Sequence, residues 1–191
     1  MFRFALLIAV ALWATVEAQK YVKGQCPASQ TKALALNPSL LRKKFFLRGS
    51  FNNYLFERDD PKCERLYMFK GSGDSIYEYY FQVYNNETVI RQATTDLGKS
   101  PYTFNTVMNT KFDEIRGGLR DVILPLELIA TDGENYAVLY SCKGMMGPQK
   151  LEIALAYTTK VNDASYDDII KTAIQNRGLD SSKLKITKQV C

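Results

Sequence analysis

The sequence predicts an all-β protein in which eight antiparallel strands form a sandwich or a barrel and one helix follows near the C-terminus. Three observations support this fold class. From residue 44 onward, short β-rich runs alternate with turn residues at regular intervals. After the eighth run, the hydrophobic period changes from two to 3.6, which is the period of an α-helix. The chain carries four cysteines, and the last of them is residue 191.

The first 18 residues have the pattern of a secretory signal. An apolar run from Phe4 to Val16 leads to Val16-Glu17-Ala18, a small-residue cleavage site. The run is shorter than the roughly 20 apolar residues that cross a bilayer. We therefore expect a signal peptide over residues 1–18 and a single mature domain over residues 19–191. The alternative is an N-terminal anchor.

The predicted strands are separated by residues that favour turns. Asn85-Asn86, Gly71-Ser72-Gly73 and the segment from Gly98 to Pro101 are the clearest separators, because Gly and Asn tolerate positive φ. No internal repeat or linker indicates a second domain. The eight expected strands are Lys44 to Asn52, Cys63 to Lys70, Ile76 to Tyr84, Glu87 to Thr94, Tyr102 to Asn109, Val122 to Ala130, Asn135 to Cys142 and Gln149 to Thr158.

A single amphipathic helix is predicted from Tyr166 to Arg177. Its apolar residues fall at i, i+3, i+4, i+7 and i+8 and so share one stripe, which should pack on the outer face of the sheet. Ser165 and Asp168 resemble a capping box, and Gly178 stands where a helix would end. A short final strand follows, with Leu184, Ile186 and Val190 alternating. The stripe consists of Tyr166, Ile169, Ile170, Ala173 and Ile174.

The cysteines and one sequon fit an exported, extracellular protein. A secreted chain with Cys26, Cys63, Cys142 and Cys191 should form two disulfides, with three possible pairings. Asn86-Glu87-Thr88 is a glycosylation sequon in a polar turn, so Asn86 is the expected glycosylation site.

The composition argues against an enzyme. The chain has no histidine, which excludes Ser-His-Asp and Cys-His triads, a proximal haem ligand and His-rich zinc sites. Asp59-Asp60 and Asp167-Asp168 are explained by a turn and by a helix start. We expect no catalytic residue and no metal site.

The charge pattern argues against a nucleic-acid partner. The net charge of +5 is modest, and basic residues cluster only at Arg42-Lys43-Lys44, without interleaved aromatic residues. No stretch beyond the signal is long and apolar enough to span a membrane. We therefore expect neither nucleic-acid binding nor a membrane span. Assembly into a homo-oligomer stays open.

One segment carries a family resemblance. Thr131-Asp132 with Asn135-Tyr136-Ala137, continued by Tyr140-Ser141-Cys142, resembles the turn that precedes the seventh strand of lipocalins. The resemblance extends over about residues 24 to 191 and is closest to the insect and crustacean branch that carries bilins and carotenoids. It implies an eight-stranded antiparallel up-and-down calycin barrel, with the C-terminal helix packed on its outside and a small apolar molecule held within.

Two other lipocalin signatures are altered. The family usually has Gly-x-Trp in its first strand, whereas the only Trp here lies in the signal, so Phe45 or Phe46 should plug the closed end. The family's arginine after the eighth strand is replaced by Tyr157-Thr158-Thr159-Lys160. These departures concern the identity of the ligand more than the fold.

The resemblance also implies the pairing of the cysteines, Cys26 with Cys142 and Cys63 with Cys191. Because an N-terminal strap cannot run through a barrel, Cys142 should face outward, and alternation then turns Ser141, Leu139 and Ala137 inward. A slip of one residue would invert this assignment. With the family's strand order, the expected ligand-binding residues are Tyr80, Tyr102, Phe104, Met108, Val122, Leu124, Leu126, Leu139 and Ser141, and Thr106 shares their face.

Two interpretations of the eighth strand stay open. Leu151, Ile153, Leu155 and Tyr157 share one face, and Glu152, Ala154, Ala156 and Thr158 share the other. If the helix covers the large residues, the small face lines a roomy cavity. Alternatively, the large residues fill a core. The many strand tyrosines could stack against a conjugated ligand or simply suit half-exposed strands.

The resemblance predicts a secreted carrier that binds a small hydrophobic ligand without covalent chemistry and requires no cofactor. The expected ligand is a pigment such as a bilin or a carotenoid, or a lipid such as a fatty acid. The alternative is a secreted interaction or storage lipocalin with a filled cavity that acts through its surface, for which the segment from Asn52 to Pro61 is a candidate.

Overall fold

The computed structural model describes residues 22–28, 40–51, 62–73, 75–85, 88–96, 104–109, 123–144 and 147–191. The expected signal peptide, the segment from Asn52 to Pro61 and the sequon residue Asn86 lie outside the described residues. Within the described part, no helix has both the length and the apolar character needed to span a membrane.

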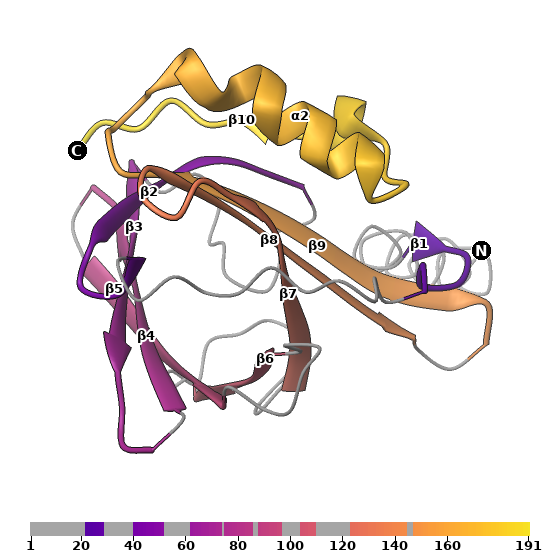
Figure 1. Ribbon diagram of the computed structural model, residues 1–191, viewed down its shortest axis with the longest axis horizontal. Helices are drawn as coiled ribbons and strands as arrows, with labels where there is room; N and C mark the ends of the chain where they lie inside the picture. Colours follow the sequence, from indigo (N-terminus) through magenta and orange to yellow (C-terminus); the bar gives the residue numbers. More distant parts are fainter. Residues whose placement is uncertain are drawn as a thin grey trace, which may run out of the picture.

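The structure is an antiparallel sheet that curls back on itself (Figure 1). Each strand from β2 to β9 pairs with the next in the chain, and β9 also pairs with β2, which closes the hydrogen-bonded order. Strand β1 adds to β9, and β10 adds to β2. The strands are β1 (Val22–Lys23), β2 (Lys44–Phe51), β3 (Cys63–Lys70), β4 (Ser75–Val83), β5 (Thr88–Asp96), β6 (Phe104–Asn109), β7 (Ile123–Thr131), β8 (Tyr136–Gly144), β9 (Gln149–Thr158) and β10 (Lys185–Ile186).

The predicted eight-stranded architecture with one C-terminal helix is confirmed. Strands β3 and β9 have the predicted limits, and the others begin or end within two residues of them. The reason is that alternation and Gly or Asn turns are both local signals. The barrel predicted from the family resemblance is therefore formed by the strands that sequence analysis assigned to it.

The helical segment differs from the prediction at its start. A 3₁₀ turn, η2 (Ala164–Tyr166), precedes α2 (Asp167–Asn176). The predicted capping box of Ser165 and Asp168 is wrong, because the Asp163 carboxylate caps the turn by accepting from the Ser165 N–H at 3.0 Å. The predicted end is confirmed, with Gly178 at φ +80° following the helix.

Helix α2 covers the outside of β8 and β9 (Figure 1). Its buried residues Ile170 and Ile174 belong to a cluster with Ala154 and Ala156 of β9. The helix therefore rests on the small face of β9. Of the two interpretations that the sequence left open, the one in which the large residues fill a core is confirmed. Small side chains let a helix approach the sheet closely, and alternation sends the large residues inward.

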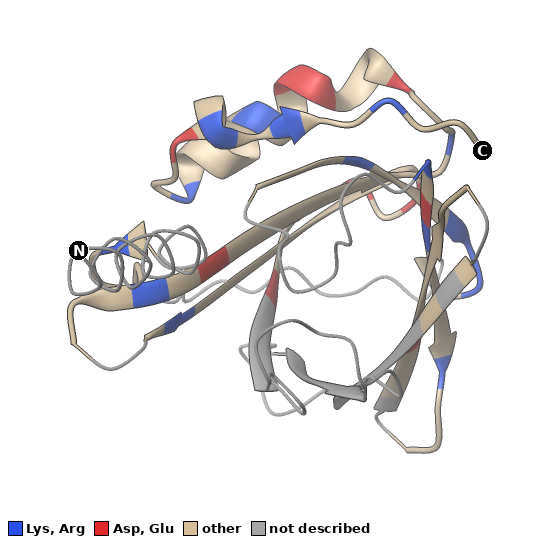
Figure 2. Ribbon diagram, turned by 180° about the vertical axis from the view of Figure 1, so that it is seen from behind, with Lys and Arg blue, Asp and Glu red and all other residues tan. Residues whose placement is uncertain are grey.

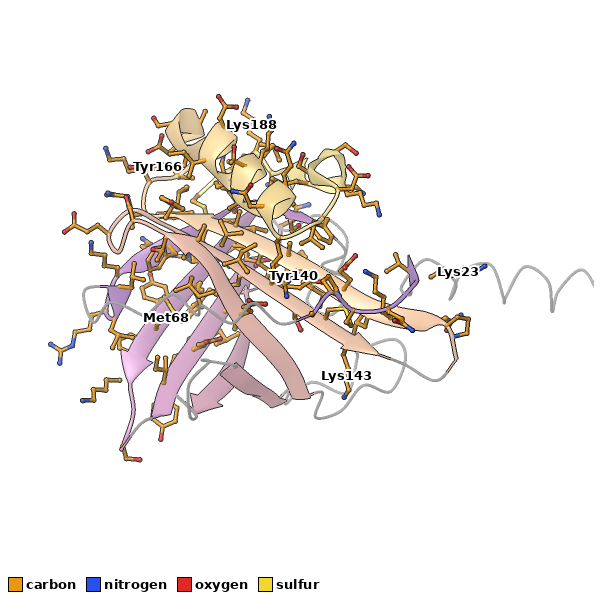
Figure 3. All side chains as sticks on the ribbon, turned by 45° about the vertical axis from the view of Figure 1, so that its right-hand side comes forward. Lys23, Met68, Tyr140, Lys143, Tyr166 and Lys188 are labelled. Atoms are coloured by element: carbon orange, nitrogen blue, oxygen red, sulfur yellow. A yellow bond between two sulfur atoms is a disulfide. The ribbon has the colours of Figure 1, made fainter. Side chains whose placement is uncertain are left out.

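Polar contacts complete this outer layer. Arg177 at the end of α2 pairs with Glu127 at 2.9 Å and lies over the ring of Tyr140, 5.1 Å from its centroid. Figure 3 shows Tyr140 beneath the helix. At the other end of α2, Arg48 of β2 holds Asp167 with two hydrogen bonds of 2.7 and 2.6 Å. Charged residues thus fix both ends of the helix to the barrel, and Figure 2 shows several charges along this layer.

Both disulfides form the pairs implied by the resemblance, Cys26 with Cys142 and Cys63 with Cys191. They join residues 116 and 128 positions apart. Loop-entropy models assign such long loops about 4 to 5 kcal/mol each. The first disulfide ties the N-terminal segment to β8, and the second ties the C-terminus to the start of β3.

The C-terminal segment forms part of the barrel wall. Strand β2 pairs with β3 up to Phe46 and with β10 at Gly49 and Ser50. Beyond β10, the Val190 N–H donates to the Lys62 carbonyl at 2.6 Å, and the Gln189 side-chain oxygen accepts from the Glu64 N–H. A Cβ at Gly49 would lie 3.1 Å from the Lys185 carbonyl oxygen, so a side chain there would press against β10. The tail therefore covers the seam where β2 leaves β3.

Candidate functional site: the barrel interior

The interior of the barrel is lined by one apolar cluster from β2, β3, β4, β7, β8 and β9, together with Leu40 from the segment before β2. Its residues are only 0 to 6% exposed, so the described side chains pack against one another. Of the two residues expected to plug the closed end, Phe45 is fully buried in this cluster and Phe46 is only partly buried. The cluster consists of Leu40, Phe45, Leu47, Leu66, Met68, Ile76, Tyr80, Leu128, Ala137, Leu139, Leu151, Ile153, Leu155 and Tyr157.

A buried polar network crosses this interior. Tyr157 donates to Glu64 Oε1 at 3.1 Å, and Gln82 Nε2 donates to Glu64 Oε2 at 2.9 Å. On β4, the Tyr80 hydroxyl donates to Glu78 Oε2 at 2.6 Å. Both glutamates and Gln82 are at most 4% exposed. Hydrogen bonds of this kind are what buried carboxylates require, because desolvation without them is costly.

The two tyrosines stay protonated. Burial raises the pKa of Tyr80 well above its usual value, and the charge of Glu78 raises it further. Burial also raises the pKa of Tyr157 well above its usual value, and the charge of Glu64 raises it further. Each hydroxyl therefore acts as a donor to its glutamate rather than as a proton-transfer group at neutral pH.

Sequence analysis missed Glu64, Glu78 and Gln82. Each lies in the inward phase of its strand, Glu64 with Leu66 and Met68, and Glu78 and Gln82 with Tyr80. A polar residue in the apolar phase of a strand was the signal that could have identified them.

Ser141 has an unusual position in the interior. The residue is 1% exposed, and its Oγ has no hydrogen-bond partner. In the register it lies opposite Leu126 of β7 and Ile153 of β9. A buried hydroxyl without a partner is rare, and it could bond a polar group of a bound molecule.

Three of the expected ligand-binding residues have described side chains. Tyr80, Leu139 and Ser141 are all buried, and the first two belong to the interior cluster. Phe104 and Met108 lie in β6, and Leu124 and Leu126 lie in β7, where the register pairs Phe104 with Leu126. The side chains of these four lie outside the described part, as do Tyr102 and Val122 altogether.

The strand tyrosines and phenylalanines divide among three places. Tyr80 and Tyr157 lie inside the barrel, and Tyr136 and Tyr140 lie in the cluster beneath α2. Tyr67, Phe69, Tyr79 and Phe81 contact one another on the opposite side of β3 and β4 from the interior. The aromatic residues of β3 and β4 therefore do not form a single ligand-stacking surface.

The turn with the family resemblance is a structural element. The Asp132 carboxylate accepts from the N–H groups of Glu134 and Asn135 at 2.9 and 2.7 Å and from Asn135 Nδ2 at 2.9 Å. Although burial acts to raise the pKa of Asp132, the hydrogen bonds from Asn135, Glu134 and Tyr136 lower it to about 2. Thr131 adds a hydrogen bond to the Tyr136 carbonyl at 2.6 Å. These contacts set the entry into β8, which carries Leu139 and Ser141.

A separate hollow of about 530 Å³ lies outside the barrel, between α2 and the end of β7. Its floor includes Ile129 and Ala130, and its rim includes Asp168, Thr172 and Asn176 of the helix. It is remote from the interior network, because the sheet stands between them.

Comparison with known proteins relates the fold to solved structures. Lobster apocrustacyanin A1 superposes with a TM-score of 0.69 and 18% identity, covering 90% of this chain and 92% of that one. Insecticyanin from the tobacco hornworm Manduca sexta gives 0.68 and 18%, covering 90% of each chain. The amine binding protein of Rhodnius prolixus, solved with tryptamine, gives 0.55 and 13%, covering 84% and 85%.

Comparison of the sequence with family models and with curated proteins identified no relative. No family model matches the chain, and no curated protein matches it. The likeness therefore rests on three-dimensional structure alone. The chain has the lipocalin fold.

Proposed function

We propose that the protein is a secreted carrier that holds a small hydrophobic molecule inside the barrel, without covalent chemistry. The observation that carries this proposal is the closed sheet with an apolar interior, which matches structures named as crustacyanin, insecticyanin and an amine binding protein. Burial of apolar ligand surface would supply about 25 cal/mol per Å². No catalytic step and no cofactor are part of the proposal.

The residues proposed to contact the ligand come from four strands and their neighbours. Tyr80, Leu139 and Ser141 support this part of the proposal, because all three are buried. The other proposed contacts are Tyr102, Phe104, Met108, Val122, Leu124 and Leu126.

The Ser141 hydroxyl supports a ligand with at least one polar group. A conjugated molecule with a keto, hydroxyl or pyrrole edge could bond this Oγ, whereas a saturated hydrocarbon could not. The carboxylate of a fatty acid could also bond Ser141, so a bilin or a carotenoid is proposed first because the fold resembles crustacyanin and insecticyanin.

The test is binding of these ligands by the purified protein. Visible absorbance of protein from its native source and titration with biliverdin, a carotenoid and a fatty acid should reveal a saturable ligand. Ser141→Ala should weaken binding of the preferred polar ligand about tenfold, the loss of one good hydrogen bond. Ser181→Ala, on the outside, should leave the affinity unchanged. Failure of all three ligands to bind would refute the carrier function.

A second function is favoured by the tight packing of the described interior. If the whole barrel is filled, the protein would act through its surface. Thermal melting discriminates between the two, because a ligand that binds the native state raises the melting temperature. A melting temperature that responds to none of the hydrophobic ligands would favour the surface function.

A further inference from the structure

A second surface, independent of the barrel interior, is formed by the outward residues of β2, β3 and β4. The register aligns Phe46, Arg65 and Phe81 in one row across the strands, with Ile90 of β5 next to Phe81. Residues directly opposite in antiparallel strands share a face. A second row holds Lys44, Tyr67 and Tyr79, and a third pairs Phe69 with Tyr77. We refer to these residues as the aromatic face.

The rings of the aromatic face contact one another along the surface. Tyr67 meets Phe81 edge-on with centroids 5.2 Å apart, and Phe69 meets Tyr79 edge-on at 5.9 Å. Phe69 is 40% exposed and Ile90 is 48% exposed. Helix α2 covers β8 and β9 instead (Figure 1), and the described residues place no element over the aromatic face. Exposed apolar surface of this kind marks interaction sites.

The charges of the aromatic face have one sign. Lys44 lies over the ring of Phe46 at 5.2 Å, and Arg65 lies over the ring of Phe81 at 5.9 Å. Neither cation has a carboxylate partner within the described residues, and Arg65 Nε is buried without any hydrogen-bond partner. The acids of β3 and β4, Glu64 and Glu78, are both buried in the interior. The face therefore offers aromatic rings and two cations, with no acid from β2, β3 or β4.

The rings and cations of the aromatic face indicate which kind of partner would bind there. A second copy would bring the same two cations, and a chain with a net charge of +5 repels its own kind. A membrane requires apolar side chains that protrude into the bilayer, whereas these rings lie against one another and most are half-buried. A protein surface with apolar side chains and carboxylates fits both the rings and the cations.

We infer that the aromatic face is a docking surface for an acidic protein partner whose apolar side chains lie between its carboxylates. The partner's carboxylates pair with Lys44 and Arg65, and its apolar side chains pack on Phe69 and Ile90. Binding here leaves the barrel interior untouched, so it is compatible with ligand carriage and does not depend on it.

The test uses the full, disulfide-bonded chain and a defined probe, a fluorescein-labelled random copolymer of glutamate and tyrosine, with polyglutamate as the acidic polymer that lacks rings. Fluorescence anisotropy should show saturable binding of the copolymer that is tighter than that of polyglutamate and weakens as salt rises. The double variant Lys44→Gln/Arg65→Gln and the variant Phe69→Ser should each weaken copolymer binding about tenfold.

Matched controls separate the face from net charge. Lys171→Gln/Lys183→Gln removes the same charge from the helical side, and Val161→Ser removes an exposed apolar residue elsewhere. Both should bind as the unaltered protein does. Circular dichroism of every variant confirms folding.

Three results would overturn the inference. One is copolymer binding that is absent, or equally weakened by the control variants. Another is self-association in sedimentation velocity that Phe69→Ser abolishes, which would identify a second copy as the occupant. The third is binding to phosphatidylcholine vesicles containing phosphatidylserine but not to the copolymer, which would identify a lipid surface.

Discussion

Tyr157 of β9 and Glu64 of β3, 93 positions apart in the chain, meet inside the barrel through a hydrogen bond of 3.1 Å. The contact joins two strands that do not pair with each other, because β2 lies between them. Tyr157→Phe would leave a buried carboxylate with one donor fewer and should lower the free energy of unfolding by about 1 to 3 kcal/mol. Urea denaturation measures this change. Tyr166→Phe, at the start of α2, is the control and should have little effect.

The turn at Asp132 should make stability depend on pH in the acid range. The folded pKa of about 2 lies below 3.8, the usual value for an aspartate. The carboxylate therefore stabilises the fold above pH 3.8, and this contribution is lost as the pH falls through 2. Asp132→Asn should flatten this part of the curve of melting temperature against pH.

Comparison with wild type isolates the effect of Asp132, because the pKa values of Asp163 and Asp180 are also lowered, by hydrogen bonds from Ser165 and Ser182. Glu134→Gln, in the same turn, provides the control for a change of charge. An acid-range curve that is identical for Asp132→Asn and wild type would contradict the assignment.

The contact of α2 with the barrel should depend on its buried isoleucines. Ile170 is fully buried against the small face of β9, whereas Ile169, its neighbour, is 47% exposed. Ile170→Ala should cost about 2 to 5 kcal/mol of unfolding free energy. Ile169→Ala should cost less than about 0.5 kcal/mol. Equal costs measured by urea denaturation would mean that the helix is not seated as described.

The two disulfides should contribute separately. The double variant Cys63→Ser/Cys191→Ser should lower the free energy of unfolding by about 2 to 5 kcal/mol, the usual range for a native bridge. It should also increase hydrogen exchange at the Glu64 and Val190 amides, which lie in the C-terminal seam. Cys26→Ser/Cys142→Ser should cost a similar amount but leave exchange in that seam unchanged.

The strands were predictable because their signals are local. Alternation located Cys63–Lys70 and Gln149–Thr158 to the residue. Which face of β9 packs against α2 could not be predicted, because alternation separates Leu155 from Ala156 without indicating which of the two faces the helix. That choice depends on how closely the helix approaches, which is a tertiary property.

The interior was predictable only in part. Outward placement of Cys142 correctly implied that Leu139 and Ser141 are buried. The network around Glu64 was missed because a charged residue in a strand usually faces solvent, and its donors Tyr157 and Gln82 come from other strands. Long-range partners of this kind leave little trace in a single sequence.

The segment after α2 is an integral part of the barrel wall. The Glu64 N–H donates to the Gln189 side-chain oxygen, and the Glu64 carboxylate accepts from Tyr157 and Gln82, so one residue links the C-terminal segment to the inner polar network. Truncation before Gln189, or a bulky fusion that displaces it, would remove the acceptor of the Glu64 N–H. Water could then reach the buried Glu64 carboxylate. Engineered versions of this protein should therefore carry their tags at the N-terminal side.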